Sequence, residues 1–282
     1  MKPKEFRFEK NKKFATSLAE SLKRKEANED LADSIEAFSD LQEKLYADNH
    51  HSLLLVFQGM DAAGKDSTIA NVTSGVNPSG FQVFNFKQPS EKEMDHNFLW
   101  RAWQAMPERG RIGIFNRSYY EEVLVVKVHP KIIANRRLPN KKINKAFWQQ
   151  RYEDINAMEA HLANNGTRVI KFFLNVSKDE QRKRFLSRLD RPEKNWKFSS
   201  ADLRERGFWD DYQDAFREAI EATDSDRAPW YIIPADDKRT MRAIVARIIV
   251  SELKSLDLDF PKPDKEEVAR FDAARAALMG ED

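Results

Sequence analysis

The sequence predicts an α/β protein with a doubly wound parallel sheet of about five strands, helices on both faces and a helical lid. Two observations support this fold class. Short apolar segments alternate with helical segments along the 282 residues. In addition, the apolar run 52–58 leads through a glycine-containing loop, Gly59 to Gly64, into Lys65 and a helical segment. This is the arrangement of a phosphate-binding loop of the G-x-x-x-x-G-K type.

The expected elements follow from apolar spacing and from glycine and proline positions. We expect strands at 52–58, 81–86, 112–115, 169–174 and 231–233. We expect helices at 28–47, 64–74, 91–106, 143–164, 179–189, 207–223 and 239–255. The first strand shows no alternation of polar and apolar residues, which predicts burial on both faces. Ligands of such sheets bind at the carboxyl ends of the strands, so the loops after the first, third and fourth strands should converge.

Three parts are expected along the chain. The first part, 1–50, comprises a polar and basic arm, which we expect to be loosely packed, and an amphipathic helix. The second, 51–257, is the core, with a lid at about 190–206. The third, 258–282, is a tail with a short helix after Pro261 and Pro263.

Composition narrows the class of protein. The hydrophobic share of 41% is sufficient for a core, and the absence of cysteine excludes disulfides and thiolate metal sites. No apolar run approaches the length of a membrane span, and the start lacks the apolar segment of a secretion signal. We therefore expect a cytoplasmic protein without a membrane partner. A net charge of +2 means that any preference for polyanions must arise from local patches.

The phosphate-binding loop is the clearest functional feature. Its glycines let backbone N–H groups close on an anion, the following helix adds its dipole, and Lys65 supplies a positive charge. The residues expected to hold phosphate here are Gly59, Met60, Ala62, Ala63, Gly64, Asp66 and Ser67. Asp66 occupies the position where Ser or Thr usually holds magnesium.

Asp61 is unexpected inside such a loop, because a carboxylate repels phosphate. Its presence is explained if it faces a magnesium ion or orients the attacking phosphoryl acceptor. The alternative is a loop carboxylate that only accepts hydrogen bonds from backbone N–H groups.

A second polar group follows the third strand, which directs it to the same edge of the sheet. Arg117 can bind a phosphate through two parallel N–H bonds, and Asn116 offers a neutral oxygen to a metal. Glu121 and Glu122 bring carboxylates close by, and we expect Glu121 to act in the site. The alternative for both glutamates is an exposed helix start, where acids suit the helix dipole.

Two basic runs flank these motifs. Between Lys127 and Arg151 there are eight Lys or Arg and no acid, and between Gln181 and Arg206 nine basic residues stand against four acidic ones. One such run is usually a solvated face. Two runs beside a phosphate loop suggest a groove for a long polyanion. No nucleic-acid recognition motif is present, so we expect no nucleic-acid partner. The five histidines show no ligand spacing.

Arg184 and Arg188 share one face of a predicted helix, with Arg191 next, as in lids that close arginines over transferring phosphates.

The chain resembles the second family of polyphosphate kinases, which are P-loop kinases. The resemblance rests on Gly59 to Asp66, on the segment 115–129 and on Trp196-Lys197-Phe198. The segment Asn116-Arg117-Ser118-Tyr119-Tyr120-Glu121-Glu122 is similar to the subgroup that phosphorylates both AMP and ADP, whereas other members carry Asp at the position of Asn116.

The resemblance implies phosphoryl transfer between inorganic polyphosphate and an adenine or guanine nucleotide. It implies a cytoplasmic homo-oligomer, a dimer or tetramer, that uses Mg²⁺, with Mn²⁺ as a possible substitute. The implied catalytic residues are Asp61, Lys65, Arg117 and Glu121. The implied metal ligands are Asp61, Asn116 and Glu121. Arg188 and Arg191 would bind phosphates from the lid. The basic charge predicts a polyphosphate groove at Arg136, Arg137, Lys141 and Lys142.

Two other functions stay open on the sequence alone. The first is an ATP-dependent nucleoside or nucleotide kinase of the thymidylate or deoxynucleoside kinase type, which shares the loop and the lid. The second is a non-catalytic phosphate-sensing subunit, for which Lys65→Ala would leave function intact while only oligomerisation or partner binding matters.

Overall fold

A computed structural model describes residues 1–18, 22–134, 136, 138–139 and 142–281. Its centre is a sheet of five parallel strands in the order β2-β3-β1-β4-β5. The strands are β1 (Ser52–Gln58), β2 (Phe81–Asn85), β3 (Ile112–Asn116), β4 (Thr167–Asn175) and β5 (Trp230–Pro234). The expected doubly wound α/β fold is confirmed.

The central strand β1 explains why the site lies where it does. All seven of its residues are buried, as its continuous apolar sequence predicts. Phe57 pairs with Asn116 of β3 on one side and with Phe172 of β4 on the other, and the two phenyl rings stack with centroids 4.9 Å apart. The loops that follow β1 and β3 therefore begin side by side at one edge of the sheet.

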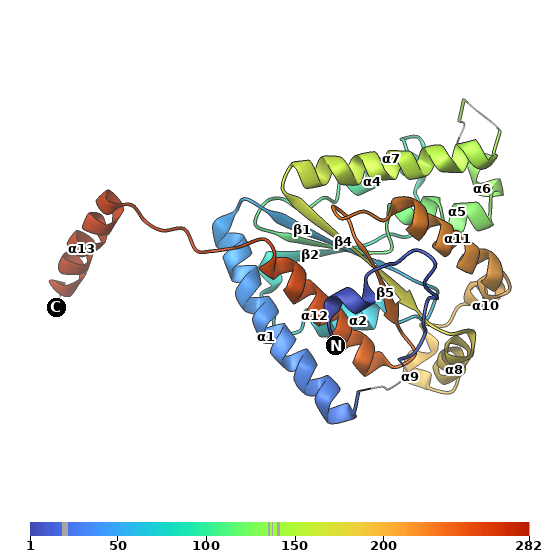
Figure 1. Ribbon diagram of the computed structural model, residues 1–282, viewed down its shortest axis with the longest axis horizontal. Coiled ribbons are helices and arrows are strands. Elements are labelled where there is room, and N and C mark those ends of the chain that lie inside the picture. Colours follow the sequence, from blue (N-terminus) through green and yellow to red (C-terminus); the bar gives the residue numbers. More distant parts are fainter. Residues whose placement is uncertain (19–21, 135, 137, 140–141, 282) are drawn as a thin grey trace.

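Helices cover both faces of the sheet (Figure 1). One face carries α1 (Arg24–Asp48), α2 (Lys65–Val72) and α12 (Lys238–Lys254). The other carries α4 (Trp100–Trp103), α7 (Lys145–Asn164) and α11 (Trp209–Thr223). Shorter or peripheral helices are α3 (Glu91–Met94), α5 (Val125–Val128), α6 (Lys131–Ala134), α8 (Lys178–Leu189), α9 (Pro192–Asn195), α10 (Ser200–Arg206) and α13 (Lys265–Met279). The expected lid segment 190–206 contains α9 and α10.

The predicted helix 91–106 is wrong, because two short helices, α3 and α4, occupy the segment instead. Ser90 and Glu93 form a capping box that starts α3. The side chain of Asn97 then accepts a hydrogen bond from the backbone N–H of Leu99 at 3.0 Å, which makes a turn between the two helices. Local side-chain bonds of this kind compete with a continuous helix.

The amino-terminal arm is not loosely packed as expected. Phe6 is buried, and the N–H of Phe8 donates to the carbonyl of Trp230 at 2.8 Å, so the arm lies along the outer edge of β5. The side chain of Asn175 donates to the carbonyls of Phe14 and Ala15. The arm thereby satisfies polar groups at a sheet edge that would otherwise be open. The division into three parts stays a prediction.

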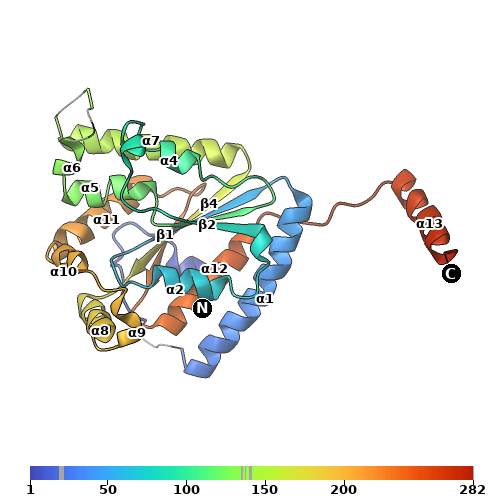
Figure 2. The same cartoon turned by 180° about the vertical axis from the view of Figure 1, so that it is seen from behind.

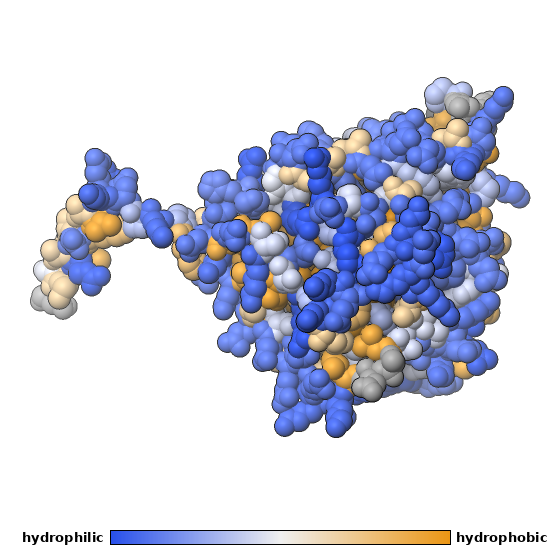
Figure 3. All heavy atoms as spheres, viewed as in Figure 1, coloured by the Kyte–Doolittle hydropathy of each residue, from blue (hydrophilic) through white to orange (hydrophobic). Residues whose placement is uncertain are grey.

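The tail carries a helix, as expected, and this helix stands apart from the body. Figures 1 and 2 show α13 at the end of an extended linker, and none of its residues is buried. Figure 3 shows apolar surface on this helix open to solvent. Phe271 of α13 is 52% exposed. Across the described ranges, no helix combines the length and apolarity needed to cross a membrane.

Candidate active site

The phosphate-binding loop connects β1 to the first turn of α2. Gly59, Ala62 and Gly64 adopt positive φ values of 153°, 61° and 111°. A Cβ atom at Gly59 would lie 2.7 Å from the carbonyl oxygen of Leu174, so the close approach of β4 requires glycine here. No side chain caps α2, so its first N–H groups are available to an anion. The loop has the geometry predicted from its sequence.

Lys65 is buried and folds back over this loop. Its Nζ donates to the carbonyl of Gly59 at 2.6 Å and to that of Met60 at 3.2 Å. Burial, and secondarily the nearby Arg117 guanidinium, lowers the pKa of Lys65 to about 8. An anion bound in the loop would oppose both effects, because it stabilises the ammonium form.

Asp61 and Glu121 lie on either side of Arg117. Arg117 Nη2 donates to Asp61 Oδ1 at 2.5 Å, and Nη1 lies 3.8 Å from Glu121 Oε2. Glu121, and to a lesser degree Asp61, raises the pKa of the Arg117 guanidinium. Arg117 has φ of 61°, a left-handed conformation that is uncommon outside glycine. The structure thus brings three of the four predicted catalytic residues into direct contact, with Lys65 close enough to interact electrostatically.

Glu121 is held from the β1 side by Gln58. When the Gln58 amide is oriented so that its oxygen accepts from Ser118, its nitrogen donates to Glu121 Oε1 at 2.8 Å. Burial raises the pKa of Glu121, and Arg117 and Lys65 oppose that rise. A partly buried carboxylate beside two cations suits a site that must accommodate the charges of phosphates and metal.

Asp66 and Asn116 form a second polar pair beside the loop. Asn116 Nδ2 donates to Asp66 Oδ1 at 2.5 Å and to Asn85 Oδ1 at 2.7 Å. Asn116 Oδ1 is buried and has no hydrogen-bond partner. An orphaned amide oxygen beside a carboxylate fits Mg²⁺, which prefers oxygen ligands and usually keeps waters or substrate phosphates as the others. Among the residues whose placement is described, no group of three His, Cys, Asp or Glu could hold a metal alone.

Helix α8 fixes the backbone of the phosphate loop. Arg184 Nη1 donates to the carbonyls of Ala62 and Ala63 at 2.9 Å each, and Nη2 donates to the carbonyl of Ala235 at 2.6 Å. Gln181 donates to the carbonyl of Asp61 at 2.9 Å. Arg184 therefore supports the loop from beneath and does not act as a lid arginine over phosphates.

The two lid arginines expected in the site have other partners. Arg188 Nη1 lies 3.2 Å from Asp202 Oδ2 of α10, and Arg191 pairs with Glu193 at 2.9 Å. Neither contacts the phosphate loop in the part of the chain that is described. Burial raises the pKa of Asp202, and the charge of Asp61 adds to that rise. Asp202 is thus a carboxylate near the site that the sequence analysis missed.

The expected groove residue Arg136 is buried. Its guanidinium pairs with Glu122, whose other carboxylate oxygen accepts from Arg151 at 2.9 Å. This burial contradicts a groove role for Arg136, because a polyanion has no access to it. Arg137 and Lys141 lie outside the described residues, whereas Lys142 is exposed.

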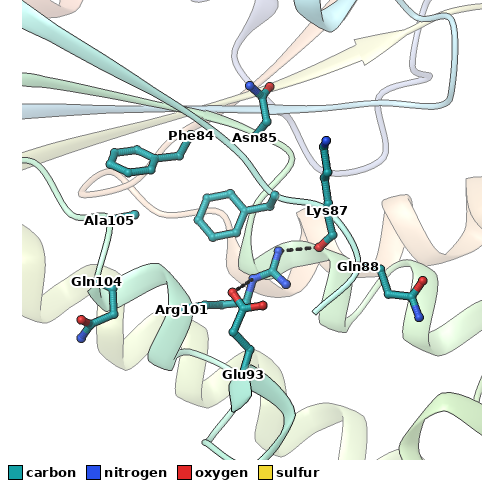
Figure 4. Close-up of a pocket in the computed structure, with 9 residues that line it drawn as sticks. Phe84, Asn85, Lys87, Gln88, Glu93, Arg101, Gln104 and Ala105 are labelled. Carbon is teal, nitrogen blue, oxygen red and sulfur yellow. Dashed lines mark hydrogen bonds and ion pairs between the residues drawn. The ribbon is translucent and has the colours of Figure 1, made fainter. Parts of the chain in front are cut away.

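A cavity of about 330 Å³ lies at the carboxyl end of β2 (Figure 4). Arg101 crosses it, donating to the carbonyl of Lys87 at 2.7 Å, with its guanidinium 4.8 Å from the centroid of the Phe86 ring. No sequence motif pointed to this cavity. Its lining residues are Phe84, Asn85, Phe86, Lys87, Gln88, Glu93, Arg101, Gln104 and Ala105.

The chain is similar to known proteins in sequence and in overall fold. The model of the Polyphosphate kinase 2 (PPK2) family matches residues 21–261. An ADP-polyphosphate phosphotransferase of Rhodopseudomonas palustris is 56% identical over 82% of this chain and 81% of its own length. An AMP/ADP-polyphosphate phosphotransferase of Meiothermus ruber is 46% identical over 79% and 80%. The crystal structure of Polyphosphate Kinase 2 from Arthrobacter aurescens TC1 superposes with a TM-score of 0.89 at 37% identity, covering 100% of this chain and 98% of that one. The chain belongs to the polyphosphate kinase 2 family.

Proposed function

We propose that this protein is a phosphotransferase that moves a phosphoryl group from inorganic polyphosphate to ADP and AMP. The observation that carries the proposal is the placement of Arg117 between Asp61 and Glu121, with Lys65 beside them in the phosphate loop. The names of the relatives from R. palustris and M. ruber support the choice of donor and acceptors.

The chemistry needs positioning and charge neutralisation. The bond between the terminal phosphorus of polyphosphate and its bridging oxygen breaks, and a bond from that phosphorus to a nucleotide phosphate oxygen forms. Polyphosphate becomes one unit shorter and no covalent enzyme intermediate is required. Lys65 and Arg117 neutralise phosphate charge, and Asp61 orients the attacking nucleotide phosphate. The reaction is reversible in principle.

Magnesium, or manganese in its place, completes the site in this proposal. Asn116, Asp61 and Glu121 would hold it, and Asp66 adds a carboxylate that contacts Asn116 directly. When bound, the ion would neutralise charge on the phosphate groups of donor and acceptor.

The cavity beside β2 is proposed to receive the nucleotide base. Strand β2 is two strands from β1, so the cavity lies roughly 10 Å from the phosphate loop at a strand spacing of about 4.8 Å. A nucleotide can span such a distance from its base to its outer phosphate. The aromatic side chains of Phe84 and Phe86 offer apolar contact, and Gln104 offers hydrogen bonds to an adenine or guanine base.

The polyphosphate chain is proposed to follow the exposed lysines of the first basic run, Lys131, Lys142 and Lys145, instead of the buried Arg136. Nucleic acid and membranes are not proposed as partners. A homo-oligomer in the cytoplasm, a dimer or tetramer, remains part of the proposal, and α13 with its exposed apolar side chains is available for contacts between copies.

The deciding experiment incubates the protein with ADP, Mg²⁺ and long-chain polyphosphate without ATP. We expect ATP to form, with AMP converted to ADP in a parallel reaction, and Lys65→Ala to abolish both. If polyphosphate yields no ATP and the protein instead transfers phosphate from ATP to a nucleoside or a nucleoside monophosphate, it is an ATP-dependent kinase. If the wild-type protein shows no transfer activity with either donor, the phosphate-sensing function replaces the proposal.

A further inference from the structure

A buried polar cluster holds the segment that carries Arg117 and Glu121. Lys171 of β4 and Glu159 of α7 form an ion pair at its centre, with Nζ and Oε2 2.5 Å apart and neither side chain more than 2% exposed. Such a pair contributes little net stability, because both charges lose their hydration. Its place in the core of the domain therefore needs another explanation.

Two consecutive tyrosines depend on this ion pair. The hydroxyls of Tyr119 and Tyr120 each donate to Glu159 Oε1 at 2.8 Å, and Lys171 Nζ donates to the Tyr120 hydroxyl at 2.9 Å. Lys171 also donates to the carbonyl of Thr223 at 2.8 Å. Burial, and next the charge of Glu159, raises the pKa of both tyrosines, so they remain protonated donors. One carboxylate thus fixes two neighbouring side chains of the turn Tyr119–Glu122.

Two further buried ion pairs, which share Glu122, hold the far end of the same turn. Glu122 accepts from Arg136 and from Arg151, and all three side chains are at most 6% exposed. Between the anchored residues, Glu121 points back to Arg117. The left-handed backbone of Arg117 persists only where surrounding structure imposes it.

We propose that Glu159 and Lys171 are positioning residues of the transfer reaction. They hold Tyr119 and Tyr120, and this keeps Arg117 and Glu121 directed at the phosphate loop. The inference rests on the proposed function for its kinetic test, but phosphate binding tests it independently.

The first test is the double variant Tyr119→Phe/Tyr120→Phe, which removes both hydroxyls and leaves the apolar volume in place. We expect kcat to fall by about tenfold or more, because small displacements of a positioned group are costly to rate. The matched control is Tyr231→Phe. The Tyr231 hydroxyl also donates to a paired carboxylate, Glu252, which binds Arg168 at 2.6 Å and belongs to α12 on the other face of the sheet. Its activity should stay within about twofold of wild type.

A second variant separates positioning from stability. Replacing Tyr119, Tyr120, Glu159 and Lys171 together by Phe, Phe, Leu and Met removes the four polar side chains without leaving a lone buried charge. Replacement of a buried ion pair by apolar residues is often neutral or stabilising, so we expect the melting temperature to be kept. Transfer should nonetheless fall by about tenfold or more, with weaker binding of tripolyphosphate measured by calorimetry.

The inference would be overturned if both variants kept the activity and the tripolyphosphate affinity of the wild type. It would also be overturned if activity fell only in proportion to a decrease in melting temperature. A wild-type protein that binds tripolyphosphate but forms no ATP would refute the proposed function instead. The binding comparison would then still decide the role of Glu159 and Lys171.

Discussion

Arg117 and Asp61 form an ion pair across the phosphate loop, with Arg117 Nη2 2.5 Å from Asp61 Oδ1. The pair joins the end of β3 to the loop that follows β1, and it leaves the carboxylate of Asp61 only partly covered, at 26% exposure. Under the proposed function, this open part of the carboxylate is where Mg²⁺ would meet Asp61.

The substitution Asp61→Asn removes this charge and keeps the side-chain volume. We expect transfer from polyphosphate to ADP to fall by about 100-fold or more, since the acceptor phosphate is no longer oriented. Tripolyphosphate should bind as tightly as before or more tightly, because a repelling carboxylate is gone. Near-normal turnover of Asp61→Asn would remove Asp61 from the mechanism.

Lys65 gives the site a pH dependence. With a pKa of about 8, Lys65 is cationic below that pH and neutral above it in the free protein. The value of kcat/KM for polyphosphate should therefore decrease above about pH 8. Because bound phosphate favours the ammonium form, the corresponding decrease in kcat should occur at higher pH. Coincident profiles for kcat and kcat/KM would contradict this account of Lys65.

Asn116→Asp tests the proposed metal site without an activity assay. The change places a second carboxylate against Asp66 and removes a donor to Asn85. Loss of these bonds should destabilise the metal-free protein by about 1–3 kcal/mol, and Mg²⁺ should recover most of that loss. Thermal unfolding with and without MgCl₂ measures both effects.

Asn175→Asp is the control for this experiment. Asn175 also ends a strand and donates to two carbonyl oxygens, those of Phe14 and Ala15. Its substitution should destabilise the protein without recovery by Mg²⁺. Equal recovery of both variants would mean that Mg²⁺ acts through general binding to the surface.

The base cavity can be tested by filling it. Gln104→Trp places a large ring at the cavity beside the carboxyl end of β2, so the KM for ADP should increase several-fold while the KM for polyphosphate stays unchanged. Gln82→Trp is the control, because Gln82 lines a different cavity, of about 380 Å³, that Gly113 and Met106 also line. An unchanged KM for ADP in Gln104→Trp would exclude this cavity as the base site.

If the exposed lysines of the first basic run attract polyphosphate, the KM for polyphosphate should depend on ionic strength. Changing Lys131, Lys142 and Lys145 to Glu should raise the KM for polyphosphate and reduce its dependence on ionic strength, because long-range attraction is lost. Changing Lys10, Lys13 and Lys25, which are also exposed, to Glu alters net charge by the same amount and serves as the control. Equal effects of both triple variants would show that net charge alone matters.

Much of the fold could be predicted because its signals are local. The continuous apolar run of β1 and the glycines at 59 and 64 determine a buried strand and the loop after it, whatever the rest of the chain does. The break between α3 and α4 escaped because Asn97 caps a turn inside an otherwise helical pattern. The packing of the arm escaped because its partner, β5, lies more than 200 residues away in sequence.

The sequence predicts a site residue where the residue type within a motif determines its role. It does not do so where the role depends on a contact that only folding creates. Lys65 and Arg117 follow from motifs. Arg136 and Arg184 look like phosphate ligands in sequence, but their partners are Glu122 and the carbonyls of the phosphate loop, which only the folded chain brings to them. The sequence alone therefore does not show whether a charged side chain is buried or exposed.

The arm along β5 also constrains the order of events during synthesis. Arg7 and the residue it binds, Asp224, are 217 positions apart. The ribosome makes the arm before β5, so the arm has no docking site until β5 has emerged and paired with β4. The outer edge of the sheet can consequently close only after a segment made about 200 residues earlier has waited for its partner strand.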